Sequence, residues 1–87
     1  MEIHNAIIAT LNCRGFRKRM KRLAIYKQIR QLKIDLMLLQ ETYLKRTDKP
    51  QVEKEWGGNV YVIEGTNHSK GLLLILVGKK FMTWIYK

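Results

Sequence analysis

The chain is poor in cysteine, in acidic residues and in long apolar runs, and each shortage excludes a class of protein. Cys13 is the only cysteine among 87 residues, so no internal disulfide and no cysteine-based zinc site can form. The longest strongly apolar run covers residues 72–77, which is too short to span a bilayer. The N-terminus lacks the basic, apolar and small-residue segments of a secretory signal. The sequence therefore predicts an intracellular protein that does not cross a membrane.

Basic residues outnumber acidic ones by a wide margin. Seventeen Lys and Arg against seven Asp and Glu give a formal net charge of +10. Such a charge favours polyanionic partners, meaning nucleic acid or an anionic membrane surface, and says little about the fold. Residues 1–50 hold twelve basic and four acidic side chains, whereas residues 51–87 hold five and three. The positive charge is therefore concentrated in the N-terminal part of the chain.

The densest part of this excess lies between residues 14 and 22. Six of the nine side chains there are cationic: Arg14, Arg17, Lys18, Arg19, Lys21 and Arg22. One interpretation is a solvated helix face, which such a run often forms. The other is a surface that contacts phosphates, and for this role we single out Arg14, Arg17, Lys18, Arg19 and Arg22. DNA or RNA is then the expected partner, and the nucleus is a candidate compartment.

Apolar runs and turn signals predict an α/β domain. Residues 6–11 are apolar and partly β-branched, which indicates a buried strand ending at Asn12. Residues 19–32 contain no Gly or Pro and predict an amphipathic helix. Its apolar stripe consists of Ile25, Ile29 and Leu32, and its basic flank consists of Arg19, Arg22, Arg30 and Lys33. Residues 36–39 form a second apolar run without polar alternation, as in a strand covered on both faces. Together these segments predict a βαβ unit with parallel strands.

The rest of the chain predicts antiparallel strands after this unit. Residues 43–58 are expected to be irregular, with turn signals at 47–50 and a glycine pair at 57–58. Residues 59–64 and 72–77 predict two strands joined by a polar, glycine-bounded loop. Residues 81–86 predict the start of one further strand. The 46% hydrophobic content indicates a folded segment, and the chain is long enough for one small domain.

Two polar residues follow the parallel strands of the predicted unit. Asn12 closes the first apolar run, and Glu41 lies just past the second. Parallel neighbours end at the same edge of a sheet, where open α/β sheets usually place their ligand sites. An amide oxygen beside a carboxylate suits Mg²⁺ or Mn²⁺ rather than zinc. The alternatives are ordinary: Asn is a common turn former, and a Glu at a strand end is often a solvated charge.

Three short segments resemble the endonuclease/exonuclease/phosphatase family. They are Leu11-Asn12-Cys13-Arg14-Gly15, Leu38-Leu39-Gln40-Glu41-Thr42 and the stretch from Ser69 to Leu76, in the family's order and spacing. Within the family, the sequence is most similar to the apurinic-type endonuclease domains of non-long-terminal-repeat retrotransposons. The resemblance covers roughly residues 6–81. It implies a four-layer α/β sandwich, in which two sheets pack face to face with helices outside.

The resemblance also implies a role for individual residues. Glu41 matches the family's divalent-metal glutamate, with Mg²⁺ or Mn²⁺ as cofactor. Asn12 matches the asparagine that helps to bind the metal or to orient the scissile phosphate, so both residues are predicted to be catalytic. Gln40 is expected to support the metal-binding residues without binding the metal itself. Leu11 departs from the tryptophan common at its position in related repair nucleases.

A larger departure concerns the family's later motifs. These supply an Asp-x-Asn pair, further aspartates and a Ser-Asp-His, which place the attacking water and accommodate the leaving oxygen. No Asp occurs after Asp48, and His4 and His68 lie in the wrong segments to replace the catalytic histidine. We therefore expect an N-terminal part of such a domain, with the metal-binding corner but without the general base. Losing a general base typically costs 10²–10⁴-fold in rate.

Three hypotheses follow from the sequence. The first is a partial mobile-element endonuclease whose complete form nicks DNA by metal-assisted phosphodiester hydrolysis, inactive as this chain alone. The second is a basic module without enzymatic activity that binds DNA or RNA electrostatically. The third is a degenerate fragment without a selected activity and with a marginal fold. The first and third describe the same residues.

Overall fold

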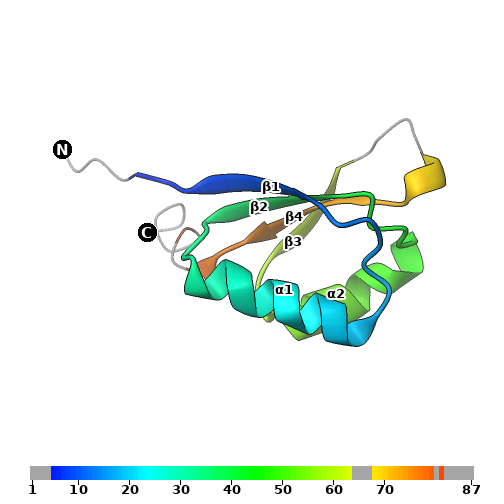
Figure 1. Ribbon diagram of the computed structural model, residues 1–87, viewed down its shortest axis with the longest axis horizontal. Helices are drawn as coiled ribbons and strands as arrows, with labels where there is room; N and C mark the ends of the chain where they lie inside the picture. Colours follow the sequence, from blue (N-terminus) through cyan, green and yellow to red (C-terminus); the bar gives the residue numbers. More distant parts are fainter. Residues whose placement is uncertain (1–4, 64–67, 80, 82–87) are drawn as a thin grey trace.

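The computed structural model describes residues 5–63, 68–79 and 81, which form a sheet with two helices on one face (Figure 1). The elements are β1 (Ile8–Asn12), α1 (Arg19–Gln31), β2 (Leu36–Gln40), the 3-10 helix η1 (Arg46–Asp48), α2 (Lys49–Trp56), β3 (Val60–Ile63), the 3-10 helix η2 (His68–Lys70) and β4 (Leu73–Val77). This mixed content confirms the predicted α/β class. The two layers are compatible with part of a larger α/β sandwich.

The strand order in the sheet is β1-β2-β4-β3. β1 and β2 are parallel and are connected through α1, so the predicted βαβ unit is confirmed. β4 lies antiparallel to β2 on one side and to β3 on the other. The strands expected at 59–64 and 72–77 are therefore present, as Val60–Ile63 and Leu73–Val77. Most of the strand expected at 81–86 lies outside the described residues, and Phe81, the one described residue within it, is helical.

The segment expected to be irregular between residues 43 and 58 instead contains a helix, α2. Pro50 lies in its first turn, where a missing backbone N–H has no cost. Gly57 ends it in the left-handed conformation, with φ 74°, as helix C-termini commonly require. Only Val52 and Trp56, four residues apart, are buried on its inner side. With so short an apolar stripe, the helix depends on packing against the sheet and α1.

The core lies between the sheet and the two helices. Its largest fully buried side chains include Phe16, Tyr26, Ile29 and Leu39. The Phe16 and Tyr26 rings meet edge to face with centroids 5.7 Å apart, and Trp56 of α2 lies 5.8 Å from Tyr26. The predicted stripe of α1 was therefore partly wrong, since Tyr26 and Ile29 are buried while Leu32 is exposed. The cause is α2, which adds a second partner for α1 and turns Tyr26 inward.

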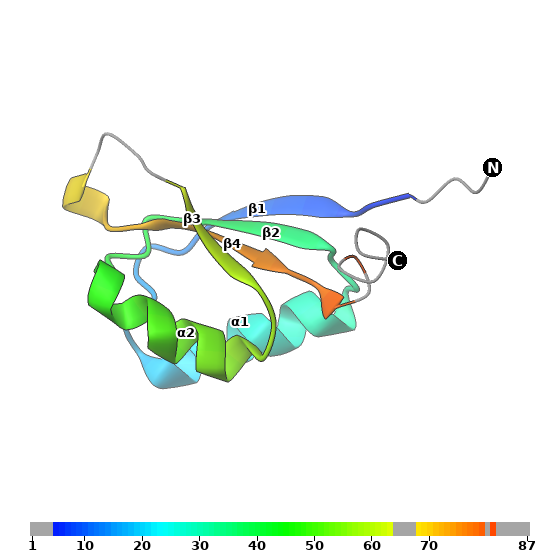
Figure 2. The ribbon, with the colours of Figure 1, turned by 180° about the vertical axis from the view of Figure 1, so that it is seen from behind.

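The other face of the sheet carries no helix among the described residues, and Figure 2 shows the same from behind. In β2, Met37 and Leu39 are buried, whereas Leu36, Leu38 and Gln40 are half-buried. The prediction that this strand is covered on both faces is therefore wrong for the described part of the chain. Its unbroken apolar run reflects close strand neighbours as well as the helices.

Within the described ranges, no helix is long and apolar enough to cross a membrane.

Candidate metal and nucleic-acid site

The chain segments that leave β1 and β2 stay bonded to each other beyond the strands. The N–H of Cys13 donates to the carbonyl of Gln40 at 2.8 Å, and Gly15 donates to Glu41 at 2.8 Å. Phe16 then donates to Thr42 at 2.9 Å. Asn12 and Gln40 are direct partners in the register, so Gln40 lies beside Asn12. The two exits therefore form one platform at the carboxyl edge of the parallel strands.

On this platform the side chains of Asn12 and Glu41 meet, although 29 positions separate them. Asn12 Nδ2 donates a hydrogen bond to Glu41 Oε2, and Asn12 Oδ1 accepts one from the Arg14 N–H at 3.1 Å. Because Arg14 holds the amide oxygen, the amide nitrogen faces the carboxylate. Lys70 Nζ lies 3.7 Å from Glu41 Oε1. The Glu41 side chain is 24% exposed, so this carboxylate is partly accessible from solvent.

Three residues around this pair have left-handed backbone conformations that side chains usually avoid. The φ angles are 49° at Arg14, 51° at Glu41 and 57° at Tyr43. A non-glycine residue in this region is uncommon, and such strain concentrates at functional sites when the surrounding structure enforces it. Two of the three flank Thr42. The exit of β2 is therefore held in a conformation that local preferences disfavour.

Thr42 and Gly71 enforce that conformation, and sequence reasoning gave neither a role. Thr42 is fully buried, donates from Oγ1 to the Leu72 carbonyl at 2.7 Å and accepts from the Leu44 N–H at 3.2 Å. Gly71, with φ 81°, runs so close that a Cβ would lie 2.5 Å from Tyr43 N and Cα. Two features of the sequence could have indicated these roles. Thr42 is a polar residue close to an apolar run, and Gly71 directly precedes the apolar run of β4.

The donor set fits a hard divalent cation shared with a phosphate. Mg²⁺ usually keeps several waters and binds through one or two carboxylates together with substrate phosphates. Glu41 supplies two carboxylate oxygens at the surface, while Asn12 orients one of them. In the described part of the chain, no three His, Cys, Asp or Glu side chains group closely enough to hold a metal by themselves. The residues present thus suit Mg²⁺ or Mn²⁺ with Glu41 as the protein ligand.

A basic pocket of about 420 Å³ lies on the loop that follows β1. It is lined by Arg14, Gly15, Arg17, Lys18, Lys21 and Tyr43. Arg17 Nε donates to the Tyr43 carbonyl at 3.0 Å, and Lys21 Nζ donates to the Cys13 carbonyl. Three of the predicted phosphate contacts, Arg14, Arg17 and Lys18, therefore share one concave surface. Arg19 is exposed at the first residue of α1 and lies outside this pocket.

Arg22, the fifth predicted phosphate contact, has a different environment. Its Nε and Nη2 donate to the two carboxylate oxygens of Glu55, each at 2.7 Å, and both side chains are nearly buried. Tyr26 donates to the same carboxylate at 2.9 Å. The Arg22 guanidinium holds the pKa of Glu55 down to about 2, against a usual 4.5. Burial and the bond to Glu55 raise the pKa of the Tyr26 hydroxyl. Arg22 thus links α1 to α2 and is not available to a phosphate.

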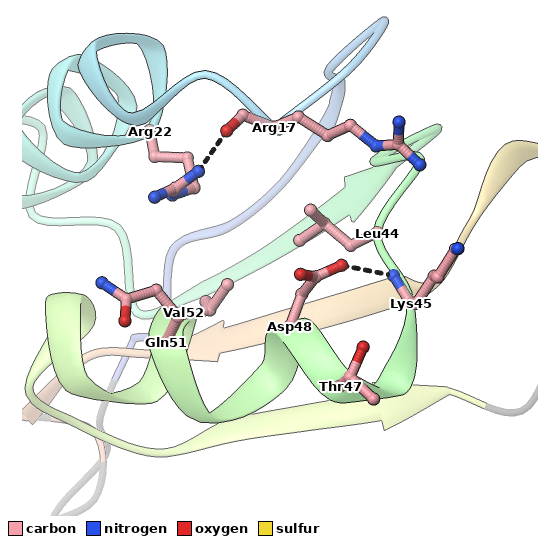
Figure 3. A pocket seen from close by; sticks show the side chains of 8 residues that line it. All are labelled: Arg17, Arg22, Leu44, Lys45, Thr47, Asp48, Gln51 and Val52. Carbon is pink, nitrogen blue, oxygen red and sulfur yellow. Dashed lines mark hydrogen bonds between the residues drawn. The ribbon is translucent and has the colours of Figure 1, made fainter.

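Arg30 acts on the same interface. Its guanidinium lies 4.7 Å from the Trp56 ring centroid, and Nη2 donates to the Trp56 carbonyl at 2.7 Å. A second pocket, of about 490 Å³, is lined by residues that include Arg17, Arg22, Lys45 and Gln51. Figure 3 shows this lining, with Arg22 donating a hydrogen bond to the backbone carbonyl of Arg17. The predicted basic flank of α1 is therefore divided: Arg22 and Arg30 bind α2, whereas Arg19 and Lys33 are exposed.

Cys13 lies beside the site but is buried and chemically quiet. Burial raises the pKa of its thiol to about 11, only partly offset by the Lys21 cation. A thiol with this pKa is protonated at neutral pH and is therefore a poor nucleophile and a poor metal ligand.

No protein-family model matches the chain, and no curated protein matches its sequence significantly. The functional argument therefore depends on the residues and their arrangement.

Proposed function

We propose that the chain provides the metal-binding corner and phosphate contacts of a divalent-metal-dependent endonuclease that acts on DNA. The observation that carries the proposal is the pairing of Asn12 with Glu41 at the common edge of two parallel strands. The strained exit of β2 and the adjoining basic pocket support it. The similarity of the three sequence segments to the endonuclease/exonuclease/phosphatase family gives the same assignment.

Each residue has a defined task in this proposal. Glu41 holds Mg²⁺ or Mn²⁺, and Asn12 fixes the carboxylate through its amide N–H. When bound, the metal supplies Lewis-acid stabilisation of charge on a phosphate oxygen. Arg14, Arg17 and Lys18 bind neighbouring phosphates and hold the strand in register. Without an Asp-x-Asn or Ser-Asp-His motif, the chain supplies no general base, and we expect no plasmid nicking by this chain alone.

The metal site can be tested without activity, by paramagnetic broadening of amide NMR signals during Mn²⁺ titration. We expect selective broadening around residues 12–15 and 40–43 in the native chain. Glu41→Ala should abolish it, and Asn12→Ala should weaken Mn²⁺ binding by about 10–100-fold, as loss of an orienting partner typically does. Glu53→Ala is the matched control, because it removes the same charge from an exposed site on α2. Equal broadening in native and Glu41→Ala chains would refute the assignment.

A second candidate is a basic module that binds nucleic acid without a metal. It is favoured by the clustering of Arg14, Arg17, Lys18 and Lys21 in one pocket. Four phosphate contacts predict that log affinity for single-stranded DNA falls with log salt at a slope of about −3. Under this candidate, Glu41→Ala leaves binding unchanged or stronger in the presence of Mg²⁺. Under the endonuclease proposal, the same change removes the part of the affinity that Mg²⁺ adds.

A further inference from the structure

Tyr43 lies between two basic hollows next to the candidate metal site. On one side is the pocket with Arg14, Lys18 and Lys21, and on the other is a pocket of about 310 Å³ that includes Lys45. Arg17 lines both pockets, as does Tyr43 itself. An aromatic side chain between cationic hollows is the arrangement with which proteins bind single strands, whose phosphates follow the cations while bases stack on the ring.

The backbone of Tyr43 is fixed from three directions. Its N–H donates to the Lys70 carbonyl at 2.9 Å, and its carbonyl accepts from Arg17 Nε at 3.0 Å. Gly71 packs against its N and Cα so closely that no Cβ fits. These contacts maintain φ at 57°, which a bulky residue avoids in the absence of such constraints. A rigid backbone reduces the entropy lost when the ring binds a planar partner.

The ring itself is supported but accessible. A Cβ on Gly15 would lie 3.6 Å from Tyr43 Cδ2, which is van der Waals contact, so the ring lies against the loop after β1. Tyr43 nevertheless remains 39% exposed. Burial in the core does not account for this strained residue, because an exposed aromatic gains little from it. A ligand that covers the ring would account for its exposure.

We propose that Tyr43 is a stacking platform for an unpaired base of a DNA strand whose phosphates bind Arg14, Arg17, Lys18 and Lys21. This inference rests on the proposed function and narrows its substrate to DNA with a single-stranded or unstacked nucleotide beside the metal site. Fully stacked duplex offers no free base face to the ring. Glu41 lies two residues before Tyr43, and both residues contact Lys70. The stacked nucleotide would therefore be adjacent to the phosphate that the metal contacts.

The test compares two single-stranded oligonucleotides of equal length, oligo-dT and an abasic analogue with the same phosphates, at low salt without metal. The native chain should bind oligo-dT more tightly. Tyr43→Ala should weaken binding of oligo-dT by about 5- to 150-fold, the usual range for loss of one stacked base, and change binding of the abasic analogue less than about twofold. Tyr43→Phe should retain the preference, because stacking needs the ring and not the hydroxyl.

Tyr61→Ala is the matched control, because Tyr61 is 48% exposed on β3, outside both basic pockets. It should bind both oligonucleotides as the native chain does. Quenching of 2-aminopurine in the oligonucleotide by the native chain reports stacking without any variant. Equal losses for both ligands in Tyr43→Ala, or no native preference for bases, would overturn the stacking platform while leaving phosphate binding intact. Failure of the native chain to bind either oligonucleotide would instead overturn the proposed function.

Discussion

Glu55 and Glu41 each lie beside a cationic side chain and a side-chain amide, but their carboxylates accept different numbers of hydrogen bonds. Glu55 of α2 is 6% exposed and receives bonds from Arg22, Tyr26 and Gln51. Glu41, after β2, is 24% exposed, with one amide donor and a lysine at 3.7 Å. The α1–α2 junction thus uses its carboxylate to join elements. At the strand edge, the Glu41 carboxylate can still accept further hydrogen bonds or a cation.

The comparison separates a structural charge from one for which we propose a function. A buried carboxylate whose lone pairs are all occupied has nothing to offer a ligand, and it must remain paired because isolation in the core is costly. A half-open carboxylate on a strained backbone contributes little to folding and can accept a cation. The sequence singles out Glu41 by its place after a strand, but only the surroundings in the fold show that Glu55 is a structural charge.

The largest effect should come from breaking the buried pair. Glu55→Ala leaves the Arg22 guanidinium nearly buried without a carboxylate and should lower the free energy of unfolding by about 3–5 kcal/mol. Urea unfolding followed by circular dichroism measures this change. Glu53→Ala on the same helix removes only an exposed partner 4.0 Å from Lys49 and should stay within about 0.5 kcal/mol. Equal effects of the two changes would remove the distinction between a structural and a solvated charge.

The same pair should make stability fall in acid. The folded chain lowers the pKa of Glu55 to about 2 from its usual 4.5. Stability from this group is therefore complete above about pH 4.5 and is lost as pH falls towards 2, by up to about 3 kcal/mol. Unfolding free energies at several pH values between 2 and 6 measure the change. Glu55→Gln should flatten the curve in this window, and an unchanged curve would contradict the assignment.

The smallest effect on stability should come from the other carboxylate. Glu41→Gln replaces a half-buried charge that has one hydrogen-bond donor and should change the free energy of unfolding by less than about 0.5 kcal/mol in metal-free buffer. With excess Mn²⁺, the native chain should gain stability by mass action, whereas Glu41→Gln should not. Thermal melts with and without Mn²⁺ give both quantities. A large loss of stability in metal-free buffer would mean that Glu41 belongs with Glu55 as a structural residue.

The strands and the meeting of Asn12 with Glu41 could be predicted because both follow from short-range rules. Apolar runs mark the strands, and parallel strands bring their ends together. The helix α2 could not be found this way, because Val52 and Trp56 are the only apolar residues among its eight that are buried. Its stability comes from contacts with α1 and the sheet, which periodicity over so short a segment does not reveal.

The division of the basic run was equally invisible in the sequence. Arg17 and Arg22 lie five positions apart in one cationic segment, yet one lines the basic pocket and the other binds a carboxylate 33 positions away. Charge counts cannot separate these cases, because the deciding partner comes from a helix that the sequence did not predict. The strain at Tyr43 was hidden for a similar reason, since it arises from the approach of Gly71.

The close approach of Gly71 to Tyr43 also restricts how the sequence can change. The two positions are 28 residues apart, yet a side chain at 71 would occupy the space of the backbone at 43. In any descendant of this chain that keeps the shape of the β2 exit, position 71 must remain glycine. A substitution there would be tolerated only together with a rearrangement of residues 41–44, which carry both Glu41 and Tyr43. Glycine at this position therefore marks whether a descendant keeps the backbone conformation of the β2 exit.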